Sequence, residues 1–467
     1  MHQDGESERE IFRVILTRNR GAEILLEREG CGWRLPRLGV PSRRRWAELL
    51  TAETWGKWRI ESCCLFFPSL RDSSDNALGT NAVVMEAAKE ADGTPAKMHW
   101  ESSPLALREA ALRADDCRAL RGALEEMGRY LAEPQRGAFA RPGWIQELLG
   151  WVQELAGPLG LRLTRRFQQF NASPTFSLLR IETSGAALWF KATGEPNAHE
   201  LPVTQALSHL FPRYVPELLG VHEPWNGWLT REAPGSTLDS LAALPAWTRA
   251  ARALAELQIA SIGKSVALLE SGCKDLRLPQ LIEHVDPFLA RVSELMAMQT
   301  KRPPAVLTDA ELRFLGRELK EACAALEEIG LPETLGHLDF NPGNILVSQA
   351  GCVFLDWAEG CVTHPLLTFE YLREHLKHYF AQDAATLESI GVSYLEPWRA
   401  LCSPADPVRG LSLSPLVAVF AYAAGTPAWR APELLAEPAV TAYLRSIARR
   451  MHCEALRIRE RSKPCLA

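Results

Sequence analysis

Residues 336–347 read Gly-His-Leu-Asp-Phe-Asn-Pro-Gly-Asn-Ile-Leu-Val, and residues 353–357 read Val-Phe-Leu-Asp-Trp. The polar positions follow the spacing His-x-Asp-x-x-x-x-Asn, with a further Asp after the second apolar run. A short segment containing Gly351 joins the two apolar runs, which predicts an antiparallel hairpin. Asn344 precedes the outgoing strand and Asp356 follows the returning one, so we expect both at the open end of the hairpin.

These residue types suit phosphoryl-transfer chemistry. Two oxygen ligands from Asn344 and Asp356 fit a hard cation that keeps waters and bridges phosphate oxygens, which describes Mg²⁺. Asp339 lies on the loop just before them, where it can orient an attacking hydroxyl or accept its proton. The alternative interpretation is that all three are turn formers, because Asp, Asn, Pro and Gly are the residues that turns use.

The order Asp, Asn, then a second Asp is that of protein-kinase catalytic loops. With Trp after the second Asp, residues of about 150–460 resemble the aminoglycoside phosphotransferase and choline kinase superfamily. The resemblance implies an α+β, bilobal, protein-kinase-like fold that uses ATP and Mg²⁺. By the same resemblance Asp339 is the catalytic Asp, Asn344 and Asp356 are the Mg²⁺ ligands, and His337 is a structural member of the loop.

The chain has 467 residues, which is too long for a single hydrophobic core. Strand patterns come first and helical patterns later, which favours a small β-rich lobe followed by a larger α-helical lobe. We predict a small α+β domain at 1–132, a linker and helix at 133–158, a β-rich lobe at 159–235 and a helical lobe at 236–467.

Periodicity and turn residues predict the individual elements. The first helix is expected over Trp46–Trp55, ended by Gly56, and Thr308 with Glu311 forms a capping box that opens a helix to residue 329. One short β interruption, at 345–355, is expected within the helical lobe. Further strands are predicted at 11–16, 22–26, 60–67, 81–86, 161–170, 176–182, 187–190 and 227–231, and further helices at 104–132, 144–155 and 201–211.

A kinase-like lobe needs a Lys on its third strand, paired with phosphates and with a Glu on the next helix. Lys191 ends the third strand of the predicted lobe, and Glu200 begins the helix that follows, so we predict an ion pair between them. Lys191 could instead be a solvated strand-end residue. Glu200 could cap its helix together with Asn197, and the two roles of Glu200 could coexist.

Two weaker sites follow from position in the predicted lobe. The loop at residues 171–175 joins the first two strands, so Ser173 or Thr175 is a candidate donor to a phosphate, although both are also common turn formers. This loop has no Gly, unlike the corresponding loop of protein kinases. Glu232 and Ala233 follow the last strand, where a hinge would offer backbone groups to adenine.

The first domain resembles a Nudix domain, through a strand pair, the stretch from Gly32 to Val40, a helix and Gly56. Active members carry clustered carboxylates on that helix for Mg²⁺. Here only Glu48 and Glu53 are present, so we interpret the domain as catalytically degenerate, used for packing, sensing or partner binding. A generic small α+β domain is the alternative.

Composition excludes several functional classes. The net charge of −5 gives no reason to expect a nucleic acid or an anionic membrane as partner. The longest apolar runs, such as residues 416–424, fall short of a membrane span, and the polar N-terminus is unlike a secretory signal. Eleven scattered cysteines without metal-ligand spacing favour a reduced, cytoplasmic protein.

These observations predict an ATP-dependent kinase of a small molecule that bears a hydroxyl, with ATP and Mg²⁺ between the lobes. Two alternatives stay open: a non-catalytic kinase-fold protein that binds a nucleotide or ligand for regulation, and a kinase of protein side chains. Neither the acceptor nor the oligomeric state is indicated. A cationic acceptor would be favoured if several residues after Asp356 faced the cleft; the alternative is an ordinary solvated helix face. Those residues are Glu359, His364, Glu370, Glu374 and His375.

Overall fold

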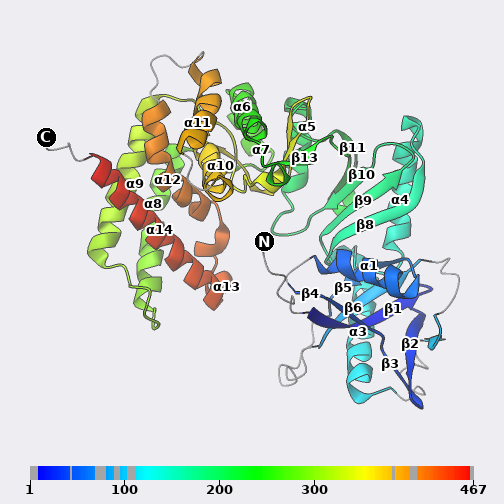
Figure 1. The fold of residues 1–467 in the computed structure, drawn as a ribbon. Helices are drawn as coiled ribbons and strands as arrows, with labels where there is room; N and C mark the ends of the chain where they lie inside the picture. Colours follow the sequence, from blue (N-terminus) through cyan, green and yellow to red (C-terminus); the bar gives the residue numbers. More distant parts are fainter. Residues whose placement is uncertain are drawn as a thin grey trace. The chain divides into compact units, whose positions relative to one another are not determined.

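The computed structural model describes residues 9–42, 45–68, 80–88, 95–102, 112–380, 384–399, 401 and 407–462. The chain divides into two compact units. The sheet unit comprises Met1–Leu201 and Glu217–Glu232, and the helical unit comprises Pro202–Pro216 and Ala233–Ala467. Strands dominate the first and helices the second (Figure 1), which confirms the predicted α+β class. The polar stretch 69–79 and the first part of the helix predicted at 104–132 lie outside the described residues.

A mixed sheet of seven strands forms the first part of the sheet unit. Its order is β3-β2-β1-β6-β5, and β4 pairs with β1 while β7 pairs with β2. Strand β6 runs parallel to β1, and the other pairs are antiparallel. The strands are β1 (Arg9–Arg18), β2 (Glu23–Glu29), β3 (Gly32–Arg34), β4 (Arg37–Pro41), β5 (Ser62–Phe66), β6 (Thr80–Ala87) and β7 (Met98–Ser102).

Two helices cover opposite faces of this sheet (Figure 1). Successive residues of a strand point to opposite faces, so β1 supplies apolar side chains to both. Val14 belongs to the core cluster that includes residues of α1 (Trp46–Trp58). Ile15 belongs to the cluster that includes residues of α3 (Ala114–Ala132).

The end of α1 differs from the prediction. The helix passes through Gly56 and reaches Trp58, and Arg59 then adopts a left-handed conformation at φ 59°. Glycine costs a helix about 1 kcal/mol relative to alanine. Trp58 is only 4% exposed, and burial of such a side chain stabilises by more than that cost. Packing therefore extends the helix past the residue that was expected to end it.

A second sheet, antiparallel throughout, follows in the order β11-β12-β10-β9-β8. Helix α4 (Trp144–Ala156) contributes Trp144 and Leu148 to the same core cluster as the inner side chains of β9, β10 and β12. The strands are β8 (Leu163–Ala172), β9 (Ser177–Thr183), β10 (Leu188–Ala192), β11 (Leu218–His222) and β12 (Gly227–Arg231).

The two sheets share one hydrophobic core. A single cluster includes Leu120 from α3, Trp144 from α4 and Phe190 from β10. The side chain of Gln169, on β8, is 2% exposed and joins the sheets directly. Its Oε1 accepts from the Cys64 N–H at 2.8 Å, and its Nε2 donates to the Cys64 carbonyl at 2.9 Å. The edge strand β5 is thereby capped by a side chain of the neighbouring sheet.

The helical unit holds most of the helices and two three-stranded sheets, in the orders β13-β16-β17 and β14-β18-β15. Its helices are α6 (Leu244–Ala260), α7 (Ser265–Glu270), α8 (Leu278–Ala297), α9 (Asp309–Ile329), α10 (Pro365–Tyr379), α11 (Ala384–Arg399), α12 (Pro407–Ala424), α13 (Pro432–Leu435) and α14 (Pro438–Ser462). Its strands are β13 (Ser236–Thr237), β14 (Lys274–Leu276), β15 (Thr334–His337), β16 (Ile345–Val347), β17 (Cys352–Phe354) and β18 (Gly360–Thr363). Helix α5 (Glu200–Leu210) begins at the border between the two units.

The prediction of one β interruption in the helical lobe is wrong. Besides the hairpin of β16 and β17, the described residues include the sheet of β14, β18 and β15. These strands have three or four residues, too few for a period of two to be visible in the sequence. The capping box of α9 is confirmed, since Thr308 Oγ1 accepts from the Glu311 N–H at 3.3 Å and Glu311 Oε2 accepts from the Thr308 N–H at 2.7 Å.

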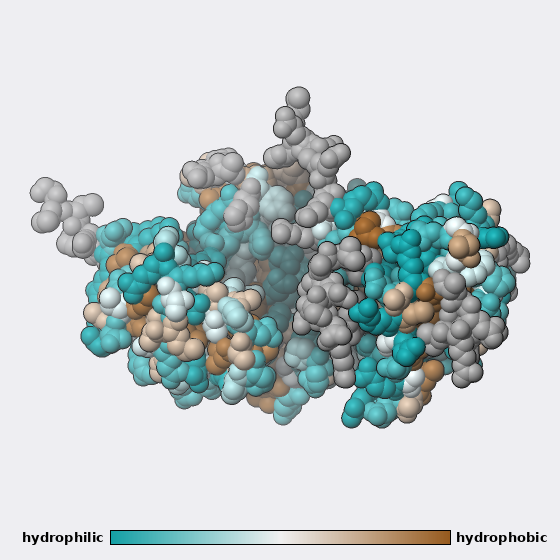
Figure 2. Space-filling view, turned by 90° about the horizontal axis from the view of Figure 1, so that it is seen from below, coloured by the Kyte–Doolittle hydropathy of each residue, from teal (hydrophilic) through white to brown (hydrophobic). Residues whose placement is uncertain are grey.

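Among the described residues, α12 is the one helix long and apolar enough for a membrane span by length and composition. However, 61% of it is buried, and Phe420 and Val417 belong to the core of the helical unit. This burial is that of a core helix. The visible faces of both units are largely hydrophilic, with hydrophobic residues scattered in small groups (Figure 2).

Candidate active site

The loop between β15 and β16 carries Asp339 and closes on itself through hydrogen bonds. The Asp339 carbonyl accepts from the Asn341 N–H at 2.9 Å and from Asn344 Nδ2 at 3.1 Å. Its carboxylate accepts from Asn341 Nδ2 at 3.1 Å and from Asn344 Nδ2 at 3.3 Å. Asn344 therefore turns its amide nitrogen towards Asp339, and its Oδ1 is the atom suited to bind a cation.

The predicted hairpin is confirmed. Strands β16 and β17 are antiparallel, with Ile345 opposite Phe354, and the Leu355 N–H donates to the Asn344 carbonyl at 2.9 Å. The backbones of Asn344 and Leu355, the residue before Asp356, are thus hydrogen-bonded at the open end of the hairpin, as expected from the sequence. Asp356 itself has φ 63°, a left-handed conformation that costs a residue other than glycine on the order of 1 kcal/mol.

His337 connects the two polar loops. Its ring is 1% exposed; Nδ1 accepts from the Asp339 N–H at 3.1 Å, and Nε2 lies 3.1 Å from the Leu355 carbonyl. These partners require the proton on Nε2, because a carbonyl only accepts. Burial lowers the pKa of His337, so the ring is neutral at physiological pH. The neutral imidazole thus fixes Asp339 relative to the residue that precedes Asp356.

The predicted pair of Lys191 and Glu200 is present. Lys191 lies on β10, the third strand of its sheet in chain order, and Glu200 begins α5. Their Nζ and Oε1 atoms are 2.5 Å apart, with side-chain exposures of 15% and 2%. A buried ion pair at these two positions provides a fixed ammonium group beside the sheet. Its contact with phosphates stays a prediction.

Ser173 lies in the loop between β8 and β9, where its side chain organises the turn. Its Oγ accepts from the backbone N–H groups of Thr175 at 3.3 Å and Phe176 at 3.2 Å. Those two N–H groups, which a phosphate would use, are therefore already engaged. A role of Ser173 in phosphate binding stays a prediction, and the structure gives this residue the ordinary part of a turn former.

Glu232 follows β12 at the border of the two units, directly before Ala233. Its carboxylate accepts from Arg180 at 2.6 and 3.0 Å and from Trp189 Nε1 at 3.1 Å. The hydrogen bond from Arg180 holds the pKa of Glu232 below its usual value. The Glu232 N–H is already used, because it donates to the Ala187 carbonyl at 2.9 Å. The backbone groups expected to contact adenine are therefore the Glu232 carbonyl and the Ala233 N–H.

Sequence reasoning missed an aromatic pair beside Lys191. Trp189 lies two residues earlier on β10, so its side chain shares the face of Lys191. Its indole stacks on Phe170 of β8, with ring centroids 5.0 Å apart and planes at 23°. Both rings are partly exposed. The signal that could have revealed this pair is the alternation of buried and partly exposed residues along β10.

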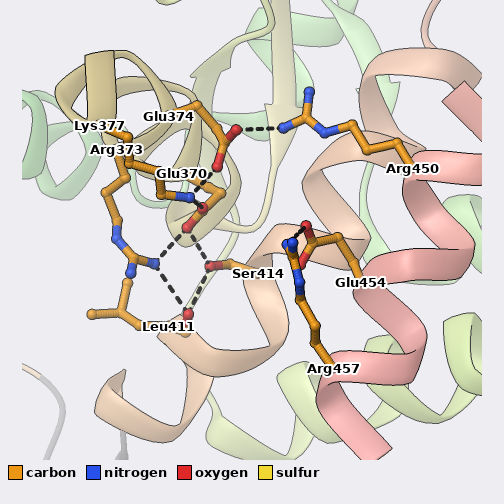
Figure 3. A network of polar contacts seen from close by, with 9 residues as sticks. All are labelled: Glu370, Arg373, Glu374, Lys377, Leu411, Ser414, Arg450, Glu454 and Arg457. Atoms are coloured by element: carbon orange, nitrogen blue, oxygen red, sulfur yellow. Dashed lines mark hydrogen bonds and ion pairs between the residues drawn. The ribbon is translucent and has the colours of Figure 1, made fainter. Parts of the chain in front are cut away.

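The acidic residues after Asp356 are paired within the helical unit. Glu359 Oε2 lies 2.5 Å from Lys274 Nζ. Glu370 and Glu374 belong to the network that joins α10, α12 and α14 (Figure 3). Glu370 is buried, which raises its pKa, and accepts from Arg373 at 2.5 Å and from Ser414 at 3.0 Å.

In the same network Glu374 contacts Lys377 and accepts from Arg450 at 2.5 Å (Figure 3). His364 is also buried, and burial lowers its pKa to about 3. None of these four side chains therefore supports a cationic acceptor: the three glutamates already pair with basic residues, and His364 is neutral at physiological pH.

Within the described ranges no group of three or more His, Cys, Asp and Glu side chains could hold a metal. Asn344 and Asp356 supply two hard oxygen donors, an amide and a carboxylate. This donor set fits Mg²⁺, which commonly uses one or two protein ligands together with waters and substrate phosphates.

A family model matches the segment that contains this hairpin. Residues 178–401 match the family model described as the phosphotransferase enzyme family, and this segment contains all the residues predicted for the site except Ser173 and Thr175. The match confirms the predicted resemblance to the aminoglycoside phosphotransferase superfamily. A search of curated proteins found no match.

Several solved structures are similar to this chain at low identity. One is a macrolide 2′-phosphotransferase from Brachybacterium faecium, at 17% identity, covering 65% of this chain and 98% of that one, with a TM-score of 0.43. Another is a choline/ethanolamine kinase family protein from Mesorhizobium loti, at 18% identity, covering 68% and 95%, with a TM-score of 0.43. A third is an ethanolamine kinase from Plasmodium vivax, at 13% identity, covering 72% and 93%, with a TM-score of 0.46.

Proposed function

We propose that the protein transfers the γ-phosphoryl group of ATP, in a Mg²⁺-dependent reaction, to a hydroxyl group of a small molecule. The observation that carries the proposal is the hairpin that presents Asn344 and Asp356 together, with Asp339 hydrogen-bonded to Asn344 at 3.3 Å. The family match supports phosphoryl transfer as the reaction class. A cytoplasmic location follows from the same proposal, because ATP is the donor.

Each residue has a defined part in this reaction. Asp339 orients the acceptor hydroxyl and takes its proton as the oxygen–phosphorus bond forms and the bond to the departing ADP oxygen breaks. Asn344 Oδ1 and the Asp356 carboxylate would hold Mg²⁺, which supplies positive charge to the phosphate oxygens when bound. Lys191, fixed by Glu200, would contact the phosphates of ATP.

We further assign the nucleobase contact to Trp189. Its indole is held by the stack with Phe170 and by the hydrogen bond to Glu232. It lies on the face of β10 that carries Lys191, two residues away, about 7 Å along the strand. A base stacked on an aromatic ring gains about 1–3 kcal/mol, which suits a donor-binding contact.

One observation favours the alternative of a non-catalytic nucleotide- or ligand-binding protein. The loop at 171–175 has no Gly, and Ser173 occupies the N–H groups of Thr175 and Phe176. A phosphate would have to displace these bonds before it could use the loop. A binding protein would tolerate substitution of Asp339, whereas the proposed enzyme would lose turnover.

The test is Mg-ATP consumption by the purified protein against pools of aminoglycosides, amino alcohols, sugars, nucleosides and hydroxy acids. Asp339→Ala should abolish turnover, and Asp286→Ala, which changes an aspartate that is 76% exposed, should leave it intact. If turnover occurs and survives Asp339→Ala, the assignment of Asp339 is wrong. If no pool is turned over and ATP with Mg²⁺ does not raise the melting temperature, the kinase proposal is wrong.

A further inference from the structure

The loop between β8 and β9 is fixed against the segment that follows β10. A Cβ at Gly194, two residues after β10, would lie 2.7 Å from Thr175 Cβ and 3.2 Å from the Thr175 carbonyl oxygen, which leaves no room for a side chain. The Pro174 carbonyl accepts from the Phe139 N–H at 3.2 Å. Together with the turn that Ser173 closes, these contacts hold the loop in one place, beside the strand that carries the lysine of the donor site.

Phe176 follows this loop, and its ring lies beside the ammonium group of Lys191. Lys191 Nζ is 6.0 Å from the centroid of the Phe176 ring and 5.8 Å from that of the Trp228 ring. Trp228 is the register partner of Lys191 on β12, so the two side chains share one face of the sheet. The negative face of an aromatic ring attracts a cation that lies within about 6 Å of its centroid. Two rings from different strands therefore hold the same ammonium group.

Glu200 completes the surroundings of this ammonium group. Its Oε1 lies 2.5 Å from Lys191 Nζ, and the Lys191 side chain is 15% exposed. An ammonium group carries three N–H donors, more than the single contact with Glu200 Oε1 uses. By contrast, Ser173 already takes the backbone N–H groups of Thr175 and Phe176. What the loop can offer a phosphate is thus the placement of Lys191.

We propose that Phe176 is a positioning residue of the donor site, and that the loop between β8 and β9 acts on the phosphates of ATP through Lys191 and not through its own backbone N–H groups. The inference rests on the proposed function. It gives the loop a task that fits its sequence, because a loop without glycine brings its backbone close to a phosphate less readily but can still fix a ring beside a lysine. Loss of one cation–π contact weakens an equilibrium about 2- to 30-fold.

The first test measures Mg-ATP binding by calorimetry, together with the KM for ATP and the KM for a productive acceptor. Phe176→Leu removes the ring and keeps the apolar character of the side chain, whereas Phe176→Tyr keeps the ring. Phe167→Leu is the control, since Phe167 is a partly exposed phenylalanine of β8 without a cation over its ring among the described residues. We expect Phe176→Leu to raise the Kd and the KM for ATP at least threefold and to leave the KM for the acceptor unchanged. The other two variants should stay within twofold of wild type.

Two results would overturn the role of Phe176 while the proposed function stands. One is an unchanged Kd for Mg-ATP in Phe176→Leu, and the other is a loss of affinity in Phe176→Tyr as large as in Phe176→Leu. Absence of Mg-ATP binding by the wild-type protein is a different result, because it would overturn the proposed function and this inference with it.

Ser173→Ala separates the two ways in which the loop could serve a phosphate, by the sign of its effect. The substitution frees the N–H groups of Thr175 and Phe176, and it loosens the turn that places the Phe176 ring. If the loop acts through Lys191, Mg-ATP binding should weaken at least twofold, measured by the same calorimetry. Binding as tight as that of wild type, or tighter, would show that the loop does not act through the ring of Phe176 and would overturn the inference.

Discussion

Replacing His337 by Phe tests how the buried imidazole positions the catalytic loop. Phe keeps the aromatic volume and the contacts with Trp357 and Phe340, whose ring centroids lie 5.0 and 5.9 Å from that of His337. It removes the acceptor of the Asp339 N–H and the donor to the Leu355 carbonyl. Both hydrogen bonds are partly buried, and a typical intramolecular hydrogen bond contributes about 0.5–1.5 kcal/mol, so the free energy of unfolding should fall by about 1–3 kcal/mol.

The same substitution should reduce activity more than stability alone explains. A misplacement of a reacting group by 1 Å costs about 100-fold in rate, and His337 fixes both Asp339 and the residue before Asp356. The assay is kcat for phosphoryl transfer at a temperature where circular dichroism shows both proteins folded, with His209→Phe, an exposed histidine, as the control. A kcat within threefold of wild type, at unchanged stability, would refute this reasoning.

Three further predictions follow. Burial lowers the pKa of His364 to about 3, so the folded protein resists protonation of this ring and stability is lost as the pH falls below about 6.5. His364→Leu should reduce the loss in free energy of unfolding between pH 7.5 and 5 by about 2 kcal/mol, measured by denaturant titration at each pH. Equal pH profiles for the two proteins would contradict this prediction. Glu200→Gln should raise the KM for ATP about tenfold by loosening Lys191, and an unchanged KM would remove Lys191 from the donor site. Gln169→Leu should cost about 2–6 kcal/mol, because it leaves two buried backbone groups without partners, and a loss below about 0.5 kcal/mol would show that the link between the sheets is unimportant.

The hairpin and its polar residues could be predicted because the decisive contacts are local. Asn344 and Asp356 flank two strands joined by a short turn, so chain connectivity alone brings them together. The pairing of Lys191 with Glu200 was predictable for the same reason, with only eight residues between them. In both cases the separation along the sequence is short, and the pattern of apolar residues fixes which side each polar group occupies.

Other features depend on contacts distant in sequence and could not be predicted. The end of α1 is set by the burial of Trp58 and not by the helix propensity of Gly56. Strand β14 exists only because it pairs with β18, some ninety residues later in the chain. Gly425, which follows α12, packs against the side chain of Leu338, a residue distant from it in the sequence. No local pattern encodes such long-range packing.

The shared core of the two sheets also depends on distant residues. Residues from α3 and from β10 meet in one cluster, and Gln169 reaches across to Cys64. The predicted domain boundaries at residues 132 and 158 stay a prediction. The Nudix-like character of the first part also stays a prediction.

The central claim, that Asp339 acts on the acceptor hydroxyl, is tested most directly by Asp339→Asn. This substitution keeps the shape of the side chain and removes its capacity to take a proton. A single-turnover experiment with γ-labelled ATP, Mg²⁺ and a productive acceptor measures transfer, and calorimetry measures ATP binding in the same sample. The account predicts ATP binding within threefold of wild type and transfer reduced at least 100-fold. Transfer at the wild-type rate would contradict it.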